Sequence, residues 1–206
     1  MTVSSDDEQL QLVKSWWNKY RYYVLLTMVG IILLSLGWRY LHDYSKRYLG
    51  YASDNYTQML YLQSQQKLDE YKGLAKKLIY DCPGSVYASL AALNLAKDAV
   101  ESNDFDVAKD HLDFVVAKSL HKGLRQIARI RLARVLNELK KYDDALALLD
   151  KTDDDGYLAN IFEARGDIFR GLGRLEEAEH FYDKAKELER NVDVYSPLLK
   201  TKLHQF

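Results

Sequence analysis

The sequence predicts an all-α protein, in which a single N-terminal transmembrane helix precedes a solenoid of paired helices. Three observations lead to this prediction. One long uncharged apolar run lies near the N-terminus, the composition is rich in helix-forming residues with only two prolines, and a spacing of small and large side chains recurs through the second half. No alternating pattern long enough for a strand is visible.

The apolar run lies between Arg21 and Arg39 and contains no charged residue. As a helix it spans about 25 Å, near the lower limit for crossing the hydrocarbon core of a bilayer, and the flanking arginines extend its reach. Aromatic residues of the kind that settle at headgroup level gather around both ends of the run: Trp16, Trp17, Tyr20, Tyr22 and Tyr23 at its start, and Trp38, Tyr40 and Tyr44 at its finish. We therefore expect residues 22–40 to cross a lipid bilayer.

Two other interpretations of this run are a cleaved signal peptide and a buried soluble helix. A signal peptide has a shorter apolar region followed by small residues, whereas bulky and charged residues follow here in Gly37-Trp38-Arg39-Tyr40. A helix that is apolar on all sides would need an apolar surrounding that the rest of the chain does not supply. The sequence favours an uncleaved anchor, but three Lys or Arg residues on each side leave its orientation open.

The chain is therefore expected to consist of a short tail (residues 1–21), the transmembrane helix (22–40), a linker or juxtamembrane helix (41–51) and one repeat domain (52–206). A net charge of −1 gives no broad basic field for nucleic acid. The single cysteine, Cys82, has no partner for an internal disulfide, and we expect a small buried apolar residue there.

The clearest repeat lies in residues 162–188 and has the tetratricopeptide pattern. Large, small and large residues mark a first helix at Phe162, Gly166 and Phe169, and Gly171 and Gly173 end it. Small, aromatic and small residues then mark a second helix, at Ala178, Tyr182 and Ala185. The small residues let two antiparallel helices approach closely, while the large ones fill the gaps.

The same pattern recurs toward the N-terminus. Residues 130–150 carry it at Ala133, Leu136, Ala145 and Leu149, and residues 92–115 carry it at Ala96, Ala99, Ala108 and Leu112. A degenerate pair fits residues 52–80, and an amphipathic segment from Ser196 to His204, with Pro197 in its first turn, is expected to cap the stack. Paired helices of this kind stack into a curved solenoid whose first helices line a groove.

No catalytic constellation with useful spacing is present, and the five histidines form no metal-ligand pair at i, i+4. The "KTDDDG" segment (151–156) lacks the alternating oxygen ligands of a calcium loop, so we expect a turn whose aspartates cap a helix. One predicted helix carries four arginines, Arg125, Arg129, Arg131 and Arg134. The first two share a face while the other two point elsewhere, so a solvated surface is favoured over an anion site. The sequence predicts a protein that is not an enzyme and has no cofactor, metal ion, nucleic acid or small-molecule substrate.

We hypothesise that the groove binds a protein segment, because apolar residues at groove positions would otherwise be exposed without reason. The alternative is that neighbouring helices cover them. The register of the repeats assigns these positions to the groove: Leu90, Leu93, Lys97, Val100, Ile127, Ile130, Arg134, Asn137, Asn160, Glu163, Asp167 and Arg170.

The order of several segments resembles the YfgM family, the ancillary subunits of the SecYEG translocon. These segments are "QLVKSWW" before the apolar run, "GWRY" at its end, "YASLAALNLAK" (87–97), "RLARVLNELKKYDDALALLD" (131–150) and "ARGDIFRGLGRLEEA" (164–178). The likeness covers nearly the whole chain.

The resemblance implies a protein of the bacterial inner membrane, with a cytoplasmic N-terminal tail and a periplasmic tetratricopeptide-like domain. It also implies two partners, the SecYEG translocon and a PpiD-like membrane-anchored peptidyl-prolyl isomerase chaperone, and a role in transferring secreted and envelope proteins. A membrane-tethered scaffold for another envelope assembly or regulatory complex remains the alternative function.

Overall fold

The structure is a computed structural model that describes residues 4–190. All elements within these residues are helices, as the sequence predicts, and none of them is a strand. The chain divides into two compact units, residues 1–50 and residues 51–206. Helix α1 (Ser4–Ser64) forms the described part of the first unit, and its last residues belong to the second. No break separates the predicted span from the predicted linker at 41–51, because α1 continues through both.

In the first unit, α1 carries the only stretch among the described residues that is long and apolar enough to cross a membrane. Its most apolar window has a mean hydropathy of 1.8, and no part of that window is buried by the protein. Aromatic side chains such as Tyr22 (70% exposed) and Trp38 (78% exposed) lie on its outer surface. Such a surface is suited to a lipid environment, in which apolar side chains need no protein cover.

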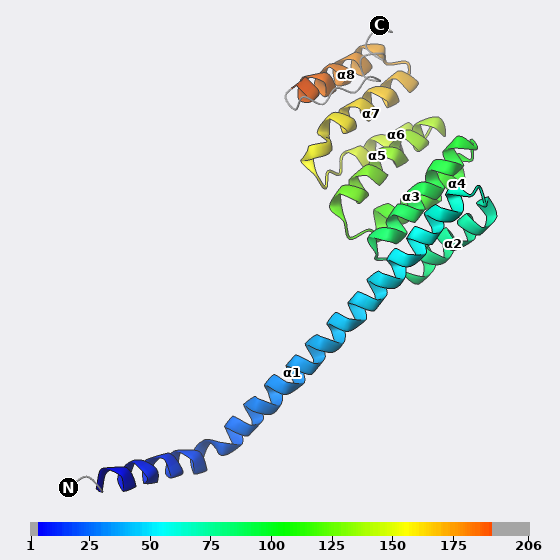
Figure 1. Ribbon diagram of the computed structural model, residues 1–206. Coiled ribbons are helices and arrows are strands. Elements are labelled where there is room, and N and C mark those ends of the chain that lie inside the picture. The colour runs from blue at the N-terminus through cyan, green and yellow to red at the C-terminus, as the bar shows by residue number, and fades with distance from the viewer. Residues whose placement is uncertain (1–3, 191–206) are drawn as a thin grey trace. The chain divides into compact units, whose positions relative to one another are not determined.

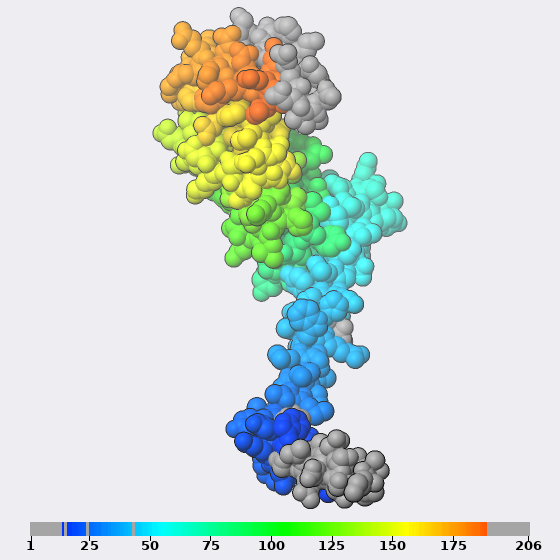
Figure 2. All heavy atoms as spheres, turned by 90° about the vertical axis from the view of Figure 1, so that its left-hand side faces the viewer, coloured from blue at the N-terminus to red at the C-terminus, as the bar shows by residue number. Residues whose placement is uncertain are grey.

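The second unit is a series of antiparallel helices (Figure 1). After the end of α1 follow α2 (Leu68–Asp81), α3 (Val86–Glu101), α4 (Phe105–Lys118), α5 (Lys122–Glu138), α6 (Tyr142–Leu149), the short 3-10 helix η1 (Asp155–Tyr157), α7 (Leu158–Gly171) and α8 (Leu175–Arg190). Each helix packs against the next, and α5 also contacts both α3 and α7. The helix pairs therefore stack in chain order, which Figure 2 shows as successive cyan, green, yellow and orange layers within this unit.

Four equivalent turns connect the two helices of each pair. One residue in each turn has a positive φ: Gln66, Asn103, Lys140 and Gly173. The amide of the next residue donates a hydrogen bond to a carbonyl five residues back, as in Lys67 to Leu62 (3.1 Å) and Asp104 to Ala99 (2.8 Å). This is the Schellman geometry that ends a helix. Because the turn from α1 to α2 has it too, the degenerate segment forms a helix pair like the others.

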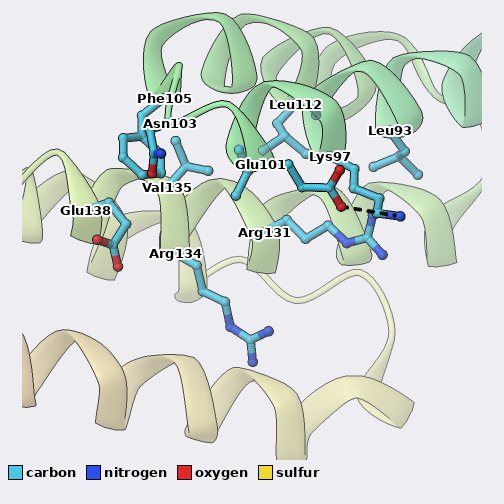
Figure 3. A pocket seen from close by; sticks show the side chains of 12 residues that line it. Leu93, Lys97, Glu101, Asn103, Phe105, Leu112, Arg131, Arg134, Val135 and Glu138 are labelled. Atoms are coloured by element: carbon cyan, nitrogen blue, oxygen red, sulfur yellow. Dashed lines mark ion pairs between the residues drawn. The ribbon is translucent and has the colours of Figure 1, made fainter.

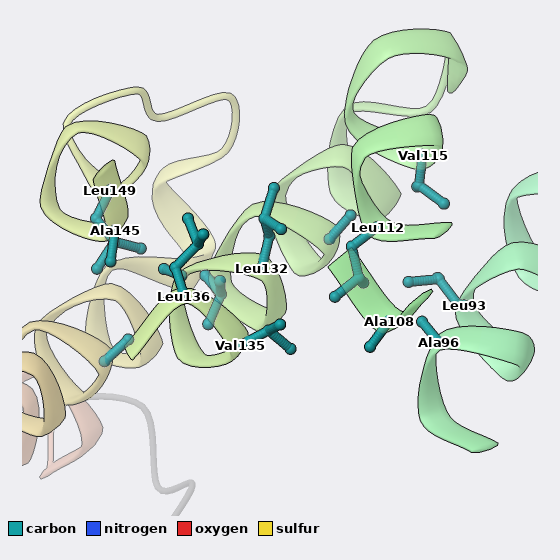
Figure 4. Close-up of a cluster of buried hydrophobic side chains, with 14 of the residues drawn as sticks. Leu93, Ala96, Ala108, Leu112, Val115, Leu132, Val135, Leu136, Ala145 and Leu149 are labelled. Atoms are coloured by element: carbon teal, nitrogen blue, oxygen red, sulfur yellow. The ribbon is translucent and has the colours of Figure 1, made fainter. Parts of the chain in front are cut away.

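The small and large residues of the repeat pattern form the core (Figure 4). Ala133, Ala145 and Leu149 are buried between α5 and α6, and the alanines and leucine predicted for α3 and α4 are buried in the same cluster. In the first pair, the rings of Tyr56 and Tyr87 lie 5.7 Å apart and join α1 to α3. Cys82 is buried, which confirms the prediction for this residue. The predicted cap at Ser196–His204 lies outside the described residues.

Candidate protein-binding groove

A pocket of about 530 Å³ opens between α3, α4 and α5 (Figure 3). Its apolar wall comes from Leu93, Ala96, Val100, Phe105, Leu112 and Val135, and its polar rim comes from Lys97, Glu101, Asn103, Arg131, Arg134 and Glu138. We call this the α3–α5 pocket. Most of its apolar side chains also belong to the core, so the pocket has a fixed floor rather than a flexible one.

The charges of the α3–α5 pocket are divided between its two ends. Lys97 and Arg131 lie close together at the end beside Leu93, whereas Glu138 lies with Phe105 at the other end (Figure 3). Lys97 forms an ion pair of 3.5 Å with Glu101, one helical turn away on α3. Arg131 forms no ion pair with any residue in the described part of the chain.

Arg134 lies at the edge of the pocket and points toward α7 (Figure 3). Its Nη2 lies 3.3 Å from Oε2 of Glu163, and its Nε lies 3.9 Å from Oδ2 of Asp167. Asp167 also accepts a hydrogen bond of 2.8 Å from the Tyr182 hydroxyl on α8. Burial, followed by the charge of Asp167, raises the pKa of the Tyr182 phenol, which therefore stays protonated and donates. This network fixes α5, α7 and α8 to one another.

The predicted groove residues separate into three groups. Leu93, Lys97, Val100 and Arg134 line the α3–α5 pocket. Glu163 and Asp167 instead bind Arg134 between the repeats. The remaining predicted residues lie in neither place: Leu90, Ile127, Ile130, Asn137, Asn160 and Arg170.

The expectation that Leu90, Leu93, Ile127 and Ile130 face outward was wrong for Leu93 and Ile130, which are buried, while Leu90 and Ile127 are partly buried. Leu93 and Ile130 are only 6% and 5% exposed and belong to the main core. Leu90 is partly buried against the same core. The reason is that α3 packs on α4 and α5 packs on both neighbouring pairs, so that neighbouring helices cover the predicted face. Leu93 nevertheless lines the α3–α5 pocket.

The register of the repeats predicted four of the twelve residues that line the pocket and missed the other eight. On α5 the lining residues are Arg131, Arg134, Val135 and Glu138, a set displaced by about one position from the predicted face. Phe105 and Leu112 come from the second helix of the pair, which the prediction left out. The helical spacing 131, 134, 135 and 138 was present in the sequence and could have indicated this face.

The expectation of a solvated surface at Arg125 and Arg129 was also wrong. Both arginines bind Asp153 of the α6–α7 loop, with distances of 3.0 Å from Nε of Arg125 and 2.6 Å from Nη1 of Arg129. The hydrogen bond from Arg125 is the main cause that lowers the pKa of the Asp153 carboxyl. The Asp153 amide donates to Gln126 (2.8 Å), so the loop is fastened to α5. In residues 4–190, no three His, Cys, Asp or Glu side chains gather as metal ligands.

Comparison with known proteins agrees with this architecture. A family described as a tetratricopeptide repeat-like domain matches residues 14–206. The chain is 28% identical over 182 residues to an "Ancillary SecYEG translocon subunit" of Aggregatibacter actinomycetemcomitans, covering 88% of this chain and 89% of the relative. A protein of the same name from Neisseria gonorrhoeae is 30% identical over 68% of each chain. The chain belongs to the family of ancillary SecYEG translocon subunits.

Another member of this family, from Escherichia coli, is 28% identical over 75% of this chain and 76% of its own length. These members are named as subunits of a complex rather than as enzymes. The α3–α5 pocket is likewise suited to binding, because it combines a rigid apolar floor with a charged rim.

Proposed function

We propose that this protein is a membrane-anchored interaction subunit of the SecYEG translocon. Membership of the family of ancillary translocon subunits carries this proposal. The apolar stretch in α1 supports the anchor, because its exposed side chains match the interior of a bilayer in length and polarity. The anchor, residues 22–40, keeps the repeat domain at the membrane where the translocon lies.

The proposed location is the bacterial inner membrane, with residues 1–21 in the cytoplasm and the repeat domain in the periplasm. This orientation follows from the likeness to the YfgM family, since the charges that flank the span are balanced. Protease added to intact spheroplasts should degrade the repeat domain. A domain that is protected until the membrane is opened would reverse the orientation.

The repeat domain acts through protein–protein contacts and assists the transfer of secreted and envelope proteins. We propose that its groove face binds extended protein segments, and that a PpiD-like periplasmic peptidyl-prolyl isomerase is a second partner. The α3–α5 pocket supports this, because its opening lies on the side where the first helices of neighbouring pairs meet and its wall is mainly apolar. A site of this size and composition is suited to a side chain of a bound segment.

Co-purification tests the proposal most directly. The full chain, tagged and extracted in mild detergent, should recover SecYEG components and a PpiD-like chaperone. An unrelated single-span protein with the same tag and a similar level of expression serves as the control. Recovery of neither the translocon nor such a chaperone, or equal recovery by the control, would overturn the proposal.

A further inference from the structure

We propose that the α3–α5 pocket selects a particular kind of segment, one with a bulky apolar side chain next to an acidic residue, and that Arg131 binds the acidic group. This inference rests on the proposed groove function and adds the chemistry of the ligand. Three features of the pocket support it: its apolar floor, the charges at the Leu93 end, and the difference between its two ends.

The floor of the pocket is suited to an apolar group of the ligand. Leu112 and Val135 are almost completely buried, and yet they border a space of about 530 Å³ that no described side chain fills. Val100 at the rim is 39% exposed. An apolar side chain placed here would fill the space beside Leu112 and Val135 and would remove the exposed part of Val100 from water, without any rearrangement of the core. Burial of apolar surface is the favourable term in most protein association. A small anion alone would leave the floor uncovered.

The cationic side chains at the Leu93 end of the pocket favour a negatively charged group of the ligand. Lys97 and Arg131 lie there with only one carboxylate, Glu101, which is paired with Lys97. Arg131 therefore has an exposed guanidinium with no ion pair in the described chain. A carboxylate of the ligand can accept two parallel hydrogen bonds from such a group, a geometry that lysine does not offer.

The remaining charges set the direction of the ligand. Arg134 is held by Glu163 and Asp167 of the next repeat, so it does not compete for the carboxylate. Glu138 at the opposite end repels a second acidic group. When the apolar side chain of the ligand occupies the pocket, an acidic neighbour is thus favoured at the Arg131 end. The same neighbour is disfavoured at the Glu138 end.

The experiment uses short fluorescent peptides of equal length and the full chain in detergent micelles, with affinity measured by anisotropy. Each peptide has a central Phe followed by Asp, Asn or Lys. The Asp peptide should bind best, and the Lys peptide about three- to tenfold more weakly, as expected for a partly exposed ion pair. Arg131→Glu should reverse this order. Lys118→Glu makes the same change of charge at an exposed position of α4 outside the pocket, and should leave the order unchanged.

A second pair of variants tests the apolar floor. Val100→Ser should weaken all three peptides, whereas Val107→Ser should weaken none, because Val107 is similarly exposed (42%) but does not line the pocket. If the peptides respond to Val100 but not to their own charge or to Arg131, the acidic preference is wrong and the groove function stands. If no peptide binds, the groove function fails as well. Binding that ignores both Val100 and Arg131 would overturn the assignment of this pocket.

Discussion

The ring of Tyr182 packs directly against the backbone of Gly166 in the last repeat. A Cβ atom built on Gly166 would lie 2.9 Å from Cζ of this ring and still closer to two of its other atoms. The ring is fully buried, and its hydroxyl donates to Asp167 one residue along α7. Position 166 therefore has to be glycine because of the side chain opposite, although glycine is a poor residue for a helix interior.

We expect Gly166→Ala to destabilise the second unit. The added methyl group forces the Tyr182 ring away from α7, and overpacking of this kind costs about 1–3 kcal/mol. The higher helix propensity of alanine offsets about 0.5–1 kcal/mol of this cost, so we expect the variant to be less stable than the wild type. Urea unfolding of the full chain in detergent, followed by circular dichroism, measures the change in the free energy of unfolding.

The preceding repeat supplies the control for this prediction, since it uses Ala133 and Leu149 at the matching positions. The double variant Gly166→Ala/Tyr182→Leu reproduces that combination and should recover much of the loss. Gly73→Ala places a methyl group in open space on α2 and should be neutral or stabilising. Equal effects of Gly73→Ala and Gly166→Ala would contradict the packing argument.

Exchanging the turn residues of two repeats should change stability in opposite directions. Lys140 has a φ of 58°, which costs a residue with a side chain about 1–2 kcal/mol, while Gly173 occupies the same place with a φ of 77°. Lys140→Gly removes this backbone strain. Part of the gain is offset because glycine loses more conformational entropy on folding, so we expect a net stabilisation of about 0.5–1 kcal/mol. Gly173→Lys should destabilise by a similar amount. The same sign for both substitutions in urea unfolding would show that the turns are not equivalent.

Asp153→Asn should destabilise the chain by about 1.5–3 kcal/mol, the range for hydrogen bonds to charged groups. The variant removes the charge that Arg125 and Arg129 share, and both arginines are mostly buried. Thermal unfolding of the full chain in detergent at neutral pH measures the loss. Asp155→Asn is the matched control and should have little effect, because Asp155 at the start of η1 is exposed and forms no ion pair within the described part of the chain.

The effect of Asp153→Asn should also depend on pH. Because the pKa of Asp153 is lowered below its ordinary value of 3.8 in the folded chain, its charge contributes stability above that value. This contribution is lost as the pH falls through the folded-state pKa. The difference between wild type and variant should therefore be constant near neutral pH and should shrink below about pH 4. A difference that persists in strong acid would assign the effect to shape rather than charge.

Local patterns predicted the repeats well, because neighbouring helices in a solenoid meet at residues that are close in sequence. Ala133 with Leu149, and Gly166 with Tyr182, occupy the predicted small and large positions. The burial of Leu93 could not be predicted from local patterns, because this burial depends on the angle at which α4 and α5 cross α3. Helical period alone does not determine that angle.

The ion-pair partners of the charged residues could not be predicted from the sequence either. Arg125 meets Asp153 across a separation of 28 residues, and Arg134 meets Glu163 across the boundary between two repeats. Each arginine looks like an ordinary surface residue of α5 when that helix is considered alone. Only the folded stack brings a carboxylate to each of these side chains, and it leaves Arg134 more exposed (42%) than Arg125 (23%).

A lysine in the middle of the proposed span should weaken the attachment of the protein to the membrane. Leu33 is exposed on α1 within the most apolar part of the chain, and a charged residue at the centre of a transmembrane helix disfavours insertion by about 2.5–3.5 kcal/mol. Leu33→Lys should therefore increase the fraction that carbonate extracts from membranes. Leu49→Lys adds the same charge to an exposed leucine of α1 beyond residue 40, and should stay in the pellet with the wild type. The two substitutions add the same charge, one within the proposed span and one beyond it. Equal extraction of both variants, or release of the wild type, would therefore mean that the apolar segment does not span the membrane.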